Sequence, residues 1–527
     1  MVWWKATAVL LLSWMGCFAL RAQDSFVSEI SVPGYGKAEL DVIVPAPRDG
    51  YFNAFFTVAS ADNPNQKRVL RASFTPQGDL IDAEWLTETI DTYGSLVKVE
   101  ELDPMRLIGK YMIAVSGNPG RVGVYDRFNS AASWLVAATL HTAVIGRPSI
   151  GDPNRRVIAA LAWGGDWMIY VLDTEDGRLI RAFRFTNRAS PTFGQIDESY
   201  LTWCCMYSRH ILAYDEASGN FLLVTGAYSS LRNHWLYLVY AFTAEGDLRW
   251  VLAFSAGFGD GYHTGGDKIG ILPLNDGTAA VYYTYYDQVF LCRIDTRLGR
   301  LLSAVAWSVT PIPRQGGSGT RKLQYMHTRN YGGLLGYVGD YSGNGIFGGV
   351  RESDWNGWQV SIPDAQLHDL KVAGVSLSGD TLWAVGGTKT RGNAAVLAVF
   401  EPDTWAEFPF SFYPCFESRQ APQVLPLGAV IAENGSASVE SVSVSPTSSA
   451  FAIRSAALQV TRSCEVSECV PSNGDVNGDG CVDDADLLAV LFAFGQTGTG
   501  LPEDVNCDGV VDDADLLTVL FNFGSGC

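Results

Sequence analysis

Short apolar or alternating runs recur between residues 30 and 420, separated by turns rich in Gly, Asp and Asn. An amphipathic helix would place apolar residues every three to four positions, and no such period persists across this region. Runs of this kind, bounded by turn residues, are typical of β-strands joined in hairpins. The pattern therefore predicts that the long first part of the chain is all-β.

One run in each cycle aligns as the second strand of a repeating unit, and successive runs begin at comparable intervals along the chain. Each run is preceded by an apolar strand and a turn, and is followed by a hairpin with a polar turn. This arrangement gives four strands per unit, and such a repeat decides the architecture of the whole region. The aligned runs begin at Tyr51, Lys110, Val157, Asn220, Gly277, Gly332 and Asp380.

Four-stranded units repeated in this way resemble the blades of β-propellers, where each blade stacks an apolar face on its neighbours. We expect a mainly β fold, a seven-bladed propeller over residues 23–422, with six or eight blades left open. The strand at residues 26–32 would complete the last blade and close the ring. The resemblance is to the architecture only, because the chain has no WD dipeptide and no regular kelch glycine pair. An eight-stranded jelly roll or a pair of sandwiches is the structural alternative.

Residues 423–462 indicate two or three further strands with a Ser-rich turn. They are expected to form a small β appendage or to add closing strands to the last blade. Residues 463–473 contain Cys and Pro and are expected to be a linker to a separate C-terminal module at residues 474–527.

Two nearly identical acidic stretches occupy this module: "DVNGDGCVDDADLL" begins at Asp475 and "DVNCDGVVDDADLL" begins at Asp504. Oxygen ligands at positions 1, 3, 5, 9 and 12, a backbone carbonyl at position 7 and Gly at position 6 are the spacing of a calcium loop. Hard oxygen ligands in this number favour Ca²⁺ over Zn²⁺ or copper. The sequence predicts two Ca²⁺ ions, held by Asp475, Asn477, Asp479, Cys481, Asp483 and Asp486 and by Asp504, Asn506, Asp508, Val510, Asp512 and Asp515.

The usual EF-hand has a helix before the loop and Glu at its last position. Here no helix is predicted before either loop, and Asp486 and Asp515 hold that position. A duplicated loop-helix of this kind resembles the type I dockerin domain. The resemblance implies binding to a cohesin module, which attaches extracellular proteins, commonly polysaccharide-degrading enzymes, to a scaffold. It also implies that positions 10 and 11 contact the partner, and these are Asp484–Ala485 and Asp513–Ala514.

The helix that follows each loop is almost entirely apolar, as in "LLAVLFAF". Part of this surface is expected to pack helix on helix, and exposed patches of the remainder mark an interface. A cohesin-like module, the propeller of this chain or a neighbouring copy of the protein could cover it.

Charge is concentrated in the same module. The formal net charge is −19, 13 of the 56 acidic residues lie after residue 464, and no Lys or Arg follows Arg462. This balance makes nucleic acid and anionic membrane poor partners, and we expect no binding of nucleic acid. A hydrophobic fraction of 47% is enough for a large core.

Residues 1–22 read as a secretory signal peptide, with Lys5 before an apolar stretch and Ala22 at the cleavage site. A lipidated Cys17 is a weaker reading. No other apolar run is long enough to span a membrane. We therefore expect a secreted, extracellular protein that is either free or associated with a cell surface.

An exported location permits disulfides. Cys464, Cys469, Cys481, Cys507 and Cys527 fall close together at the C-terminus. We expect Cys527 to pair with Cys464 or Cys469. Elsewhere, Cys204 and Cys205 are adjacent and are expected to face opposite sides of a strand, while Cys292 and Cys415 are expected to be buried thiols.

Motifs for catalysis are missing from the sequence. The six histidines show no HxH or HExxH spacing, and there is no GxSxG elbow or P-loop. Acids occur in most blade turns, so a carboxylate pair for glycoside hydrolysis cannot be selected. Two turns are distinctive: residues 256–268 bring Asp260, His263 and Asp267 among glycines, and residues 339–345 resemble half a calcium loop but are expected to be a β-turn. Catalytic residues remain unassigned.

The expected function is extracellular binding or assembly through protein–protein interaction, by a calcium-binding propeller with a dockerin-like attachment module. One alternative is a carbohydrate-active enzyme, a glycoside hydrolase or lyase delivered to polysaccharide by its module. Another is a self-assembling extracellular structural protein. Whether the chain is an enzyme stays open at this point.

Overall fold

The computed structural model describes most of the chain from residue 25 to residue 527. The description omits residues 1–24, 47–49, 88–89, 92–95, 102–109, 117–119, 127–130, 138–139, 150–154, 164–166, 197–210, 230–233, 256–267, 275, 286–287, 309–319, 329–331, 342, 352–356, 376–380, 401–415, 420–422, 426–429, 445–446, 466–472, 497–500 and 507–509.

Antiparallel units of four strands make up most of the fold, and five of these units form separate sheets. The first two are β2 (Tyr35–Ala46), β3 (Tyr51–Ser60), β4 (Gln66–Phe74) and β5 (Leu80–Trp85), and β7 (Leu96–Glu101), β8 (Lys110–Val115), β9 (Gly120–Asp126) and β10 (Ala131–Ala137). The next two are β20 (Lys268–Pro273), β21 (Thr278–Tyr285), β22 (Gln288–Asp295) and β23 (Arg300–Ser308), and β24 (Thr320–Thr328), β25 (Gly332–Tyr341), β26 (Asn344–Val350) and β27 (Gly357–Ile362). The last is β28 (Ala365–Val375), β29 (Thr381–Lys389), β30 (Ala395–Phe400) and β1 (Phe26–Ser31).

A sixth, ten-stranded sheet contains the remaining units. They are β11 (Leu140–Gly146), β12 (Val157–Trp163), β13 (Trp167–Asp173) and β14 (Leu179–Ser190), and β16 (Leu212–Asp215), β17 (Asn220–Ser229), β18 (His234–Phe242) and β19 (Leu248–Ser255). One strand, β33 (Ala432–Ser441), pairs with both β14 and β19 and so joins them. The short strands β15 (Gly194–Gln195) and β6 (Ile90–Asp91) pair with β14 and β4.

The number of blades therefore differs from the prediction. The structure has five separate blade sheets, not seven. The physical reason is β33, whose backbone hydrogen-bonds to the outer strands of two predicted blades and merges them into one sheet. The aligned runs of the sequence were nevertheless placed correctly, because they form the second strands β3, β8, β12, β17, β21, β25 and β29.

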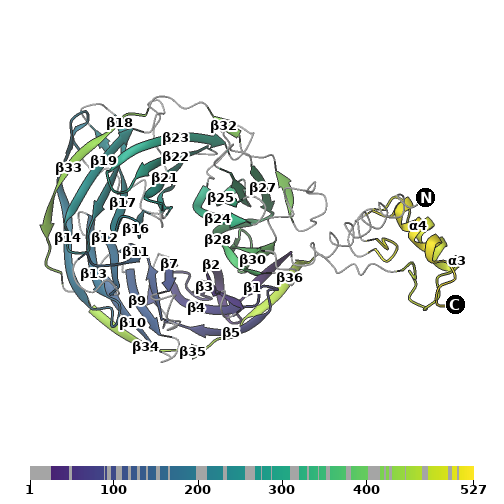
Figure 1. Ribbon diagram of the computed structural model, residues 1–527. Helices are drawn as coiled ribbons and strands as arrows, with labels where there is room; N and C mark the ends of the chain where they lie inside the picture. Colours follow the sequence, from purple (N-terminus) through teal and green to yellow (C-terminus); the bar gives the residue numbers. More distant parts are fainter. Residues whose placement is uncertain are drawn as a thin grey trace.

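The sheets are arranged as a β-propeller around a ring (Figure 1). The first strand of each unit contacts the first strand of the next, in the order β2, β7, β11, β16, β20, β24 and β28, and β28 contacts β2 again. Figure 1 shows strands such as β16, β24 and β28 toward the middle of the ring and the later strands of each unit farther out.

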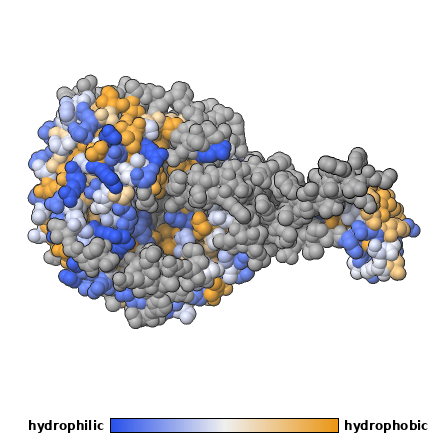
Figure 2. Space-filling model, viewed as in Figure 1, coloured by the Kyte–Doolittle hydropathy of each residue, from blue (hydrophilic) through white to orange (hydrophobic). Residues whose placement is uncertain are grey.

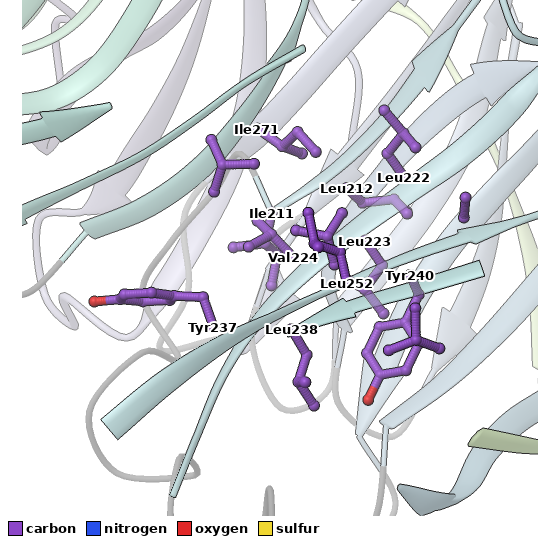
Figure 3. Close-up of a cluster of buried hydrophobic side chains, with 14 of the residues drawn as sticks. Ile211, Leu212, Leu222, Leu223, Val224, Tyr237, Leu238, Tyr240, Leu252 and Ile271 are labelled. Carbon is purple, nitrogen blue, oxygen red and sulfur yellow. The ribbon is translucent and has the colours of Figure 1, made fainter. Parts of the chain in front are cut away.

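The core lies between neighbouring sheets, because each sheet buries both faces. Every residue of β13 is buried, for example, which explains why such strands read as continuous apolar runs and not as strict alternation. The largest cluster collects side chains from the ten-stranded sheet and the adjacent β20, including Leu222, Leu238 and Ile271 (Figure 3). Burial of this kind stabilises by about 25 cal/mol per Å² of apolar surface.

The ring is closed by the first described strand. β1 lies between β30 and a late strand, β36 (Gln459–Glu465), and pairs antiparallel with both. This confirms that the strand predicted at residues 26–32 completes the last blade. Polar contacts between β2 and β28 support the closure. The backbone N–H of Ile43 donates to the carboxylate of Asp369 at 2.7 Å. The carboxylate of Asp41 accepts from the Thr57 hydroxyl at 2.6 Å and lies 3.4 Å from Nδ1 of His368.

Six strands from residues 417–465 run back around the propeller, and we call them the belt. They are β31 (Glu417–Arg419), β32 (Gln423–Leu425), β33, β34 (Thr447–Ala452), β35 (Arg454–Ser455) and β36. Taken in chain order, β31 pairs with β27, β32 with β23, β33 with both β19 and β14, β34 with β10, β35 with β5 and β36 with β1. The belt therefore meets the units in the reverse of their own order around the ring. Figure 1 shows β33, β34 and β35 on the outer rim. The strands expected over residues 423–462 thus extend around the ring instead of forming one appendage, and β36 reaches into the expected linker.

Side chains also anchor the belt. Phe451 of β34 is 8% exposed and belongs to the same core cluster as Phe26. Arg184 pairs with Glu440 at 2.9 Å. Arg462 lies over the ring of Phe26, 3.8 Å from its centroid. The belt is therefore fixed by its backbone and by a few side chains that reach the core or the sheet surface.

Several expectations fall on residues that are not described: the signal peptide at 1–22, Cys204 and Cys205, Cys415, and the turn at 256–267. The turn at residues 339–345 joins β25 and β26, whose ends pair at Tyr341 and Asn344, so the expected β-turn is confirmed. Among the described residues, no helix has the length and apolar character to cross a membrane.

We predict that Phe451→Ala lowers the free energy of unfolding by about 3–5 kcal/mol, because it leaves a cavity in a packed core. Val439→Ala on β33 is the matched control, since Val439 is 39% exposed and the loss there should be about 1 kcal/mol or less. Denaturant unfolding followed by tryptophan fluorescence measures both. Equal losses in the two variants would show that the belt carries no core contact of importance.

Candidate functional site

The first acidic loop is curled by its own side chains. Both carboxylate oxygens of Asp475 accept backbone N–H groups, from Gly478 and Gly480, each at 2.9 Å. Asn477 and Asp479 accept from backbone N–H groups two residues further on, again at 2.9 Å. Gly480 has φ of +89°, a conformation that a β-carbon would strain. The loop therefore turns its oxygen-bearing side chains toward its own interior.

The last acid of the loop is the most deeply placed. Asp486 is 0% exposed and accepts N–H groups from Val476 at 2.7 Å, Asn477 at 3.1 Å and Asp483 at 2.9 Å. Burial acts to raise the pKa of Asp486, but these N–H groups favour the charged form and the net result is a lowered pKa. Asp486 is therefore held as a carboxylate at the centre of the loop.

The same residues start a helix. Asp483 is the N-cap of α3 (Asp484–Ala493) and accepts from Ala485, while Asp486 bonds back to the N–H of Asp483. This capping box satisfies N–H groups that the first turn of a helix leaves without partners. One set of carboxylates thus shapes the loop and fixes the direction of the helix.

The second loop repeats these contacts where it is described. Asp515 is fully buried and accepts from Asn506 at 3.0 Å and Asp512 at 2.9 Å. Asp512 caps α4 (Asp513–Asn522) in the same way as Asp483 caps α3. Asp508, one of the predicted ligands, lies outside the described residues.

Each loop is bridged to the segment that follows the other helix. Val482 accepts from Gly524 at 2.8 Å and donates to Ser525 at 3.0 Å. In the second loop, Val511 bonds in the same way, accepting from Gly495 at 2.8 Å and donating to Gln496 at 3.0 Å. The two loop-helix copies therefore complete one another and share a small core that contains Val490 and Val519.

A disulfide joins the first loop to the end of the chain. Cys481 is bonded to Cys527, 46 residues away, so the expected pairing of Cys527 with Cys464 or Cys469 is wrong. The bridge between Val482 and the chain after α4 explains the outcome, because it brings Cys527 beside Cys481. The Cys481 sulfur is thereby occupied, and only its backbone carbonyl remains as a ligand for a cation. Cys464 is also disulfide-bonded.

The structure does not test the prediction of two Ca²⁺ ions. Over the parts of the chain that are described, no group of three or more His, Cys, Asp or Glu side chains is placed to hold a metal ion. The donor chemistry of the first loop nevertheless fits Ca²⁺: Asp475, Asn477, Asp479 and Asp486 offer oxygen, and the one sulfur is in a disulfide. No basic side chain of the module could neutralise these acids.

The helices leave a large apolar surface exposed, which we call the apolar face. Figure 2 shows hydrophobic residues gathered at the surface of the C-terminal module. Phe492 and Phe521 are 83% and 84% exposed, values that are unusual for phenylalanine. Each exposed apolar residue of the first copy has its counterpart in the second: Leu488, Leu491, Phe492 and Phe494 match Leu517, Leu520, Phe521 and Phe523.

The residues expected to contact a partner border this surface along the chain. Asp484, Ala485, Asp513 and Ala514 are all exposed, in the first turns of α3 and α4. The duplicated helices therefore present two equivalent combinations of exposed acid and exposed apolar side chains.

Cys292 is buried in β22 as a free thiol, as predicted, and burial raises its pKa to about 12. A thiol with this pKa is not a nucleophile near neutral pH.

A second concave site was not anticipated from the sequence. A cavity of about 480 Å³ lies where the unit β16–β19 meets the end of β11 and the turn between β22 and β23. Its lining includes Arg147, Tyr214, Asn220, Arg249, Trp250 and Arg297. The signal was present in the repeat, because Arg249 stands where three other units have an aliphatic residue, Ile81, Ile180 or Leu302.

Comparison with known proteins identifies no family for the chain. No protein-family model matches it, and no curated protein matches it. Among solved structures, the chain is similar to the propeller of Dos1, with 9% identity and a TM-score of 0.39, covering 71% of this chain and 95% of that one. It is also similar to BBS1N in complex with ARL6DN, with 11% identity and a TM-score of 0.37, covering 72% of this chain and 97% of that one. A third similar structure is Sqt1 of Saccharomyces cerevisiae, with 10% identity and a TM-score of 0.38, covering 71% of this chain and 97% of that one.

We predict that replacing both Cys481 and Cys527 by Ser loosens the first loop. Closing a chain segment of 46 residues stabilises by about 4 kcal/mol in the chain-entropy treatment. Hydrogen exchange of the full chain, read at the Val482 amide, should become faster in the double variant and also in the reduced wild type. Unchanged exchange in both would mean that the disulfide does not hold the end of the chain to the loop.

Proposed function

We propose that this protein is an exported β-propeller whose C-terminal module binds two Ca²⁺ ions and attaches the propeller to an extracellular partner. The observation that carries the proposal is the duplicated loop-helix with its paired apolar face. The propeller then acts as a binding or assembly platform, and the module acts as the attachment device.

The calcium half of the proposal is supported by charge. The first loop holds Asp475, Asp479, Asp483, Asp484 and Asp486, and no Lys or Arg follows Arg462. Like charges at these separations repel one another. A bound Ca²⁺ would remove this repulsion and use the remaining lone pairs of Asp475 and Asp479, which the backbone N–H groups leave available.

The attachment half is supported by the apolar face. Soluble proteins rarely leave contiguous apolar surfaces of this kind uncovered unless the surface binds something. The two-fold repetition of exposed Leu and Phe, with an acid beside each set, fits the dockerin resemblance. The partner of matching chemistry is a cohesin-like module with an apolar surface edged by basic residues.

We predict that Ca²⁺ protects the C-terminal module of the full chain from proteolysis and that Asp486→Asn abolishes the protection. Asp486 is 0% exposed and bonds three loop N–H groups, so its loss should weaken Ca²⁺ binding at least about tenfold. Calorimetric titration of Ca²⁺ gives the affinity, and mass spectrometry of the fragments gives the cleavage sites.

Asp484→Asn is the matched control, because it removes the same charge from the same turn of helix without touching the loop backbone. We expect a change of about twofold or less there. Equal effects of the two substitutions would indicate non-specific attraction of Ca²⁺ to an acidic surface. Identical proteolysis with Ca²⁺ and with chelator would refute the calcium assignment.

We predict that Phe492→Ser with Phe521→Ser abolishes Ca²⁺-dependent binding of the full chain to a cohesin-like module. Both rings are more than four-fifths exposed, so the protein should stay folded. Surface plasmon resonance measures binding. Because the helices are duplicates, each single substitution should weaken binding less than the pair. Full binding by the folded double variant would show that the apolar face is not the attachment surface.

A further inference from the structure

We propose that the cavity around Arg249 and Trp250 is a binding site for an acidic carbohydrate, a sugar chain that bears carboxylate or sulfate groups. This site lies on the propeller and is independent of the calcium module. It rests on four features of the structure: a β-bulge, two arginines without acidic partners, an indole ring at the cavity wall and the repetition of the fold.

A β-bulge explains how two consecutive residues reach one cavity. Neighbouring residues of a regular strand point to opposite faces. In β19, however, Phe242 pairs with Leu248 and Ala241 pairs with Trp250, so Arg249 is the extra residue. A bulge redirects side chains locally. Arg249 and Trp250 therefore both line the cavity.

Three of the other units carry the same bulge with a different residue. The skipped positions are Ile81 opposite β4, Ile180 opposite β13 and Leu302 opposite β22. All three are exposed aliphatic residues. Arg249 therefore departs from the pattern of its own repeat, and folding does not require arginine at this position. A residue that stability does not require is a candidate for binding.

Two guanidinium groups in the cavity have no carboxylate partner. Within the described part of the chain, Arg249 makes no hydrogen bond or ion pair. Among the described residues, the guanidinium group of Arg297 donates only to the carbonyl oxygen of Ala217, at 3.1 Å. Arg147, by contrast, faces Glu216 at 3.2 Å. In a protein with a net charge of −19, two guanidinium groups without a carboxylate partner favour the binding of an anion here. Guanidinium binds carboxylate or sulfate through paired N–H donors.

Trp250 gives the site a flat apolar wall. Its indole N–H donates to the carbonyl oxygen of Thr296 at 3.1 Å, which fixes one edge of the ring. The ring lies directly against Gly299, where a β-carbon would come within 2.5 Å of it. A half-buried indole held in this way offers an apolar surface for the C–H face of a sugar ring.

The shape and the lining together favour carbohydrate over acidic peptide. A volume of about 480 Å³ falls in the range of sites for small ring-shaped ligands. A peptide that added a strand to this unit would need an open sheet edge, and the belt occupies the outer edge β19. Arginines alone could also hold an acidic peptide, but the flat wall of Trp250 favours a sugar ring. A sugar ring would stack on Trp250, and its acid group would lie between the guanidinium groups of Arg249 and Arg297.

The test uses the full chain and three probes of similar length: oligogalacturonate, sulfated galactan oligosaccharide and neutral galactan oligosaccharide. Isothermal titration should show binding of one or both acidic probes and no binding of the neutral one. The two acidic probes distinguish carboxylate from sulfate as the recognised group. No binding of either acidic probe overturns the proposal.

The variants use residues that the chain already carries in equivalent places. Arg249→Ile introduces the residue found at two of the other three bulges. Arg297→Glu introduces the residue of the matching turn, where Glu175 and Arg297 both donate their backbone N–H to an Asp two residues earlier. Each should weaken binding of the acidic sugar about tenfold or more, with unchanged thermal unfolding. Arg391→Ile, at a side chain that is 92% exposed, is the matched control and should bind as the wild type does. Equal loss in the control, or equal binding of a poly-glutamate peptide, overturns the assignment to carbohydrate.

Discussion

Backbone hydrogen bonds between the belt and the outer strands hold the propeller together. Every blade ends in an outer strand whose N–H and C=O groups would otherwise face water or another protein. The belt pairs with each of these strands in turn, from β27 back to β1. One continuous segment therefore links sheets that the ring alone holds only by packing, and it converts exposed edges into interior ladders. The ten-stranded sheet depends on where this segment lies, because β33 joins β14 to β19.

The strands were predictable because side chains specify them. Apolar runs bounded by turns located the second strand of every unit, and the apolar run at residues 26–32 located the strand that closes the ring. The belt was not predictable in the same way. β33 is mostly polar and exposed, and Val439 is its one large apolar residue among Ala, Glu, Asn, Gly and Ser. Its partners are chosen by backbone hydrogen bonds, which leave no pattern in the side chains, so the merging of two blades through β33 could not be foreseen.

The candidate sites show the same division. Spacing alone identified the acidic loops, because each carboxylate has a fixed position relative to the turn. The Cys481–Cys527 disulfide depended on the pairing of Val482 with the end of the chain, which no local pattern encodes. The sequence did contain a sign of the cavity, but it is visible only when the last strands of the units are aligned with one another. After the turn, two units have Leu-Ile, a third has Leu-Leu, and the unit of the cavity has Leu248–Arg249. Once the bulge defines the register, the arginine is conspicuous.

The pairing of β1 with β36 has a consequence for how the protein is made. These strands lie at opposite ends of the propeller sequence, and β36 can join β1 only after every unit between them has been synthesised. Contacts so distant in sequence slow folding, since a long loop must close before they form. Until residues 417–465 have been added, the outer strands of the blades lack their belt partners, and the sheet that contains β1 is the last to gain one. The belt is thus the last part of the propeller to be made, and it covers strand edges that would otherwise be open to pairing with another chain.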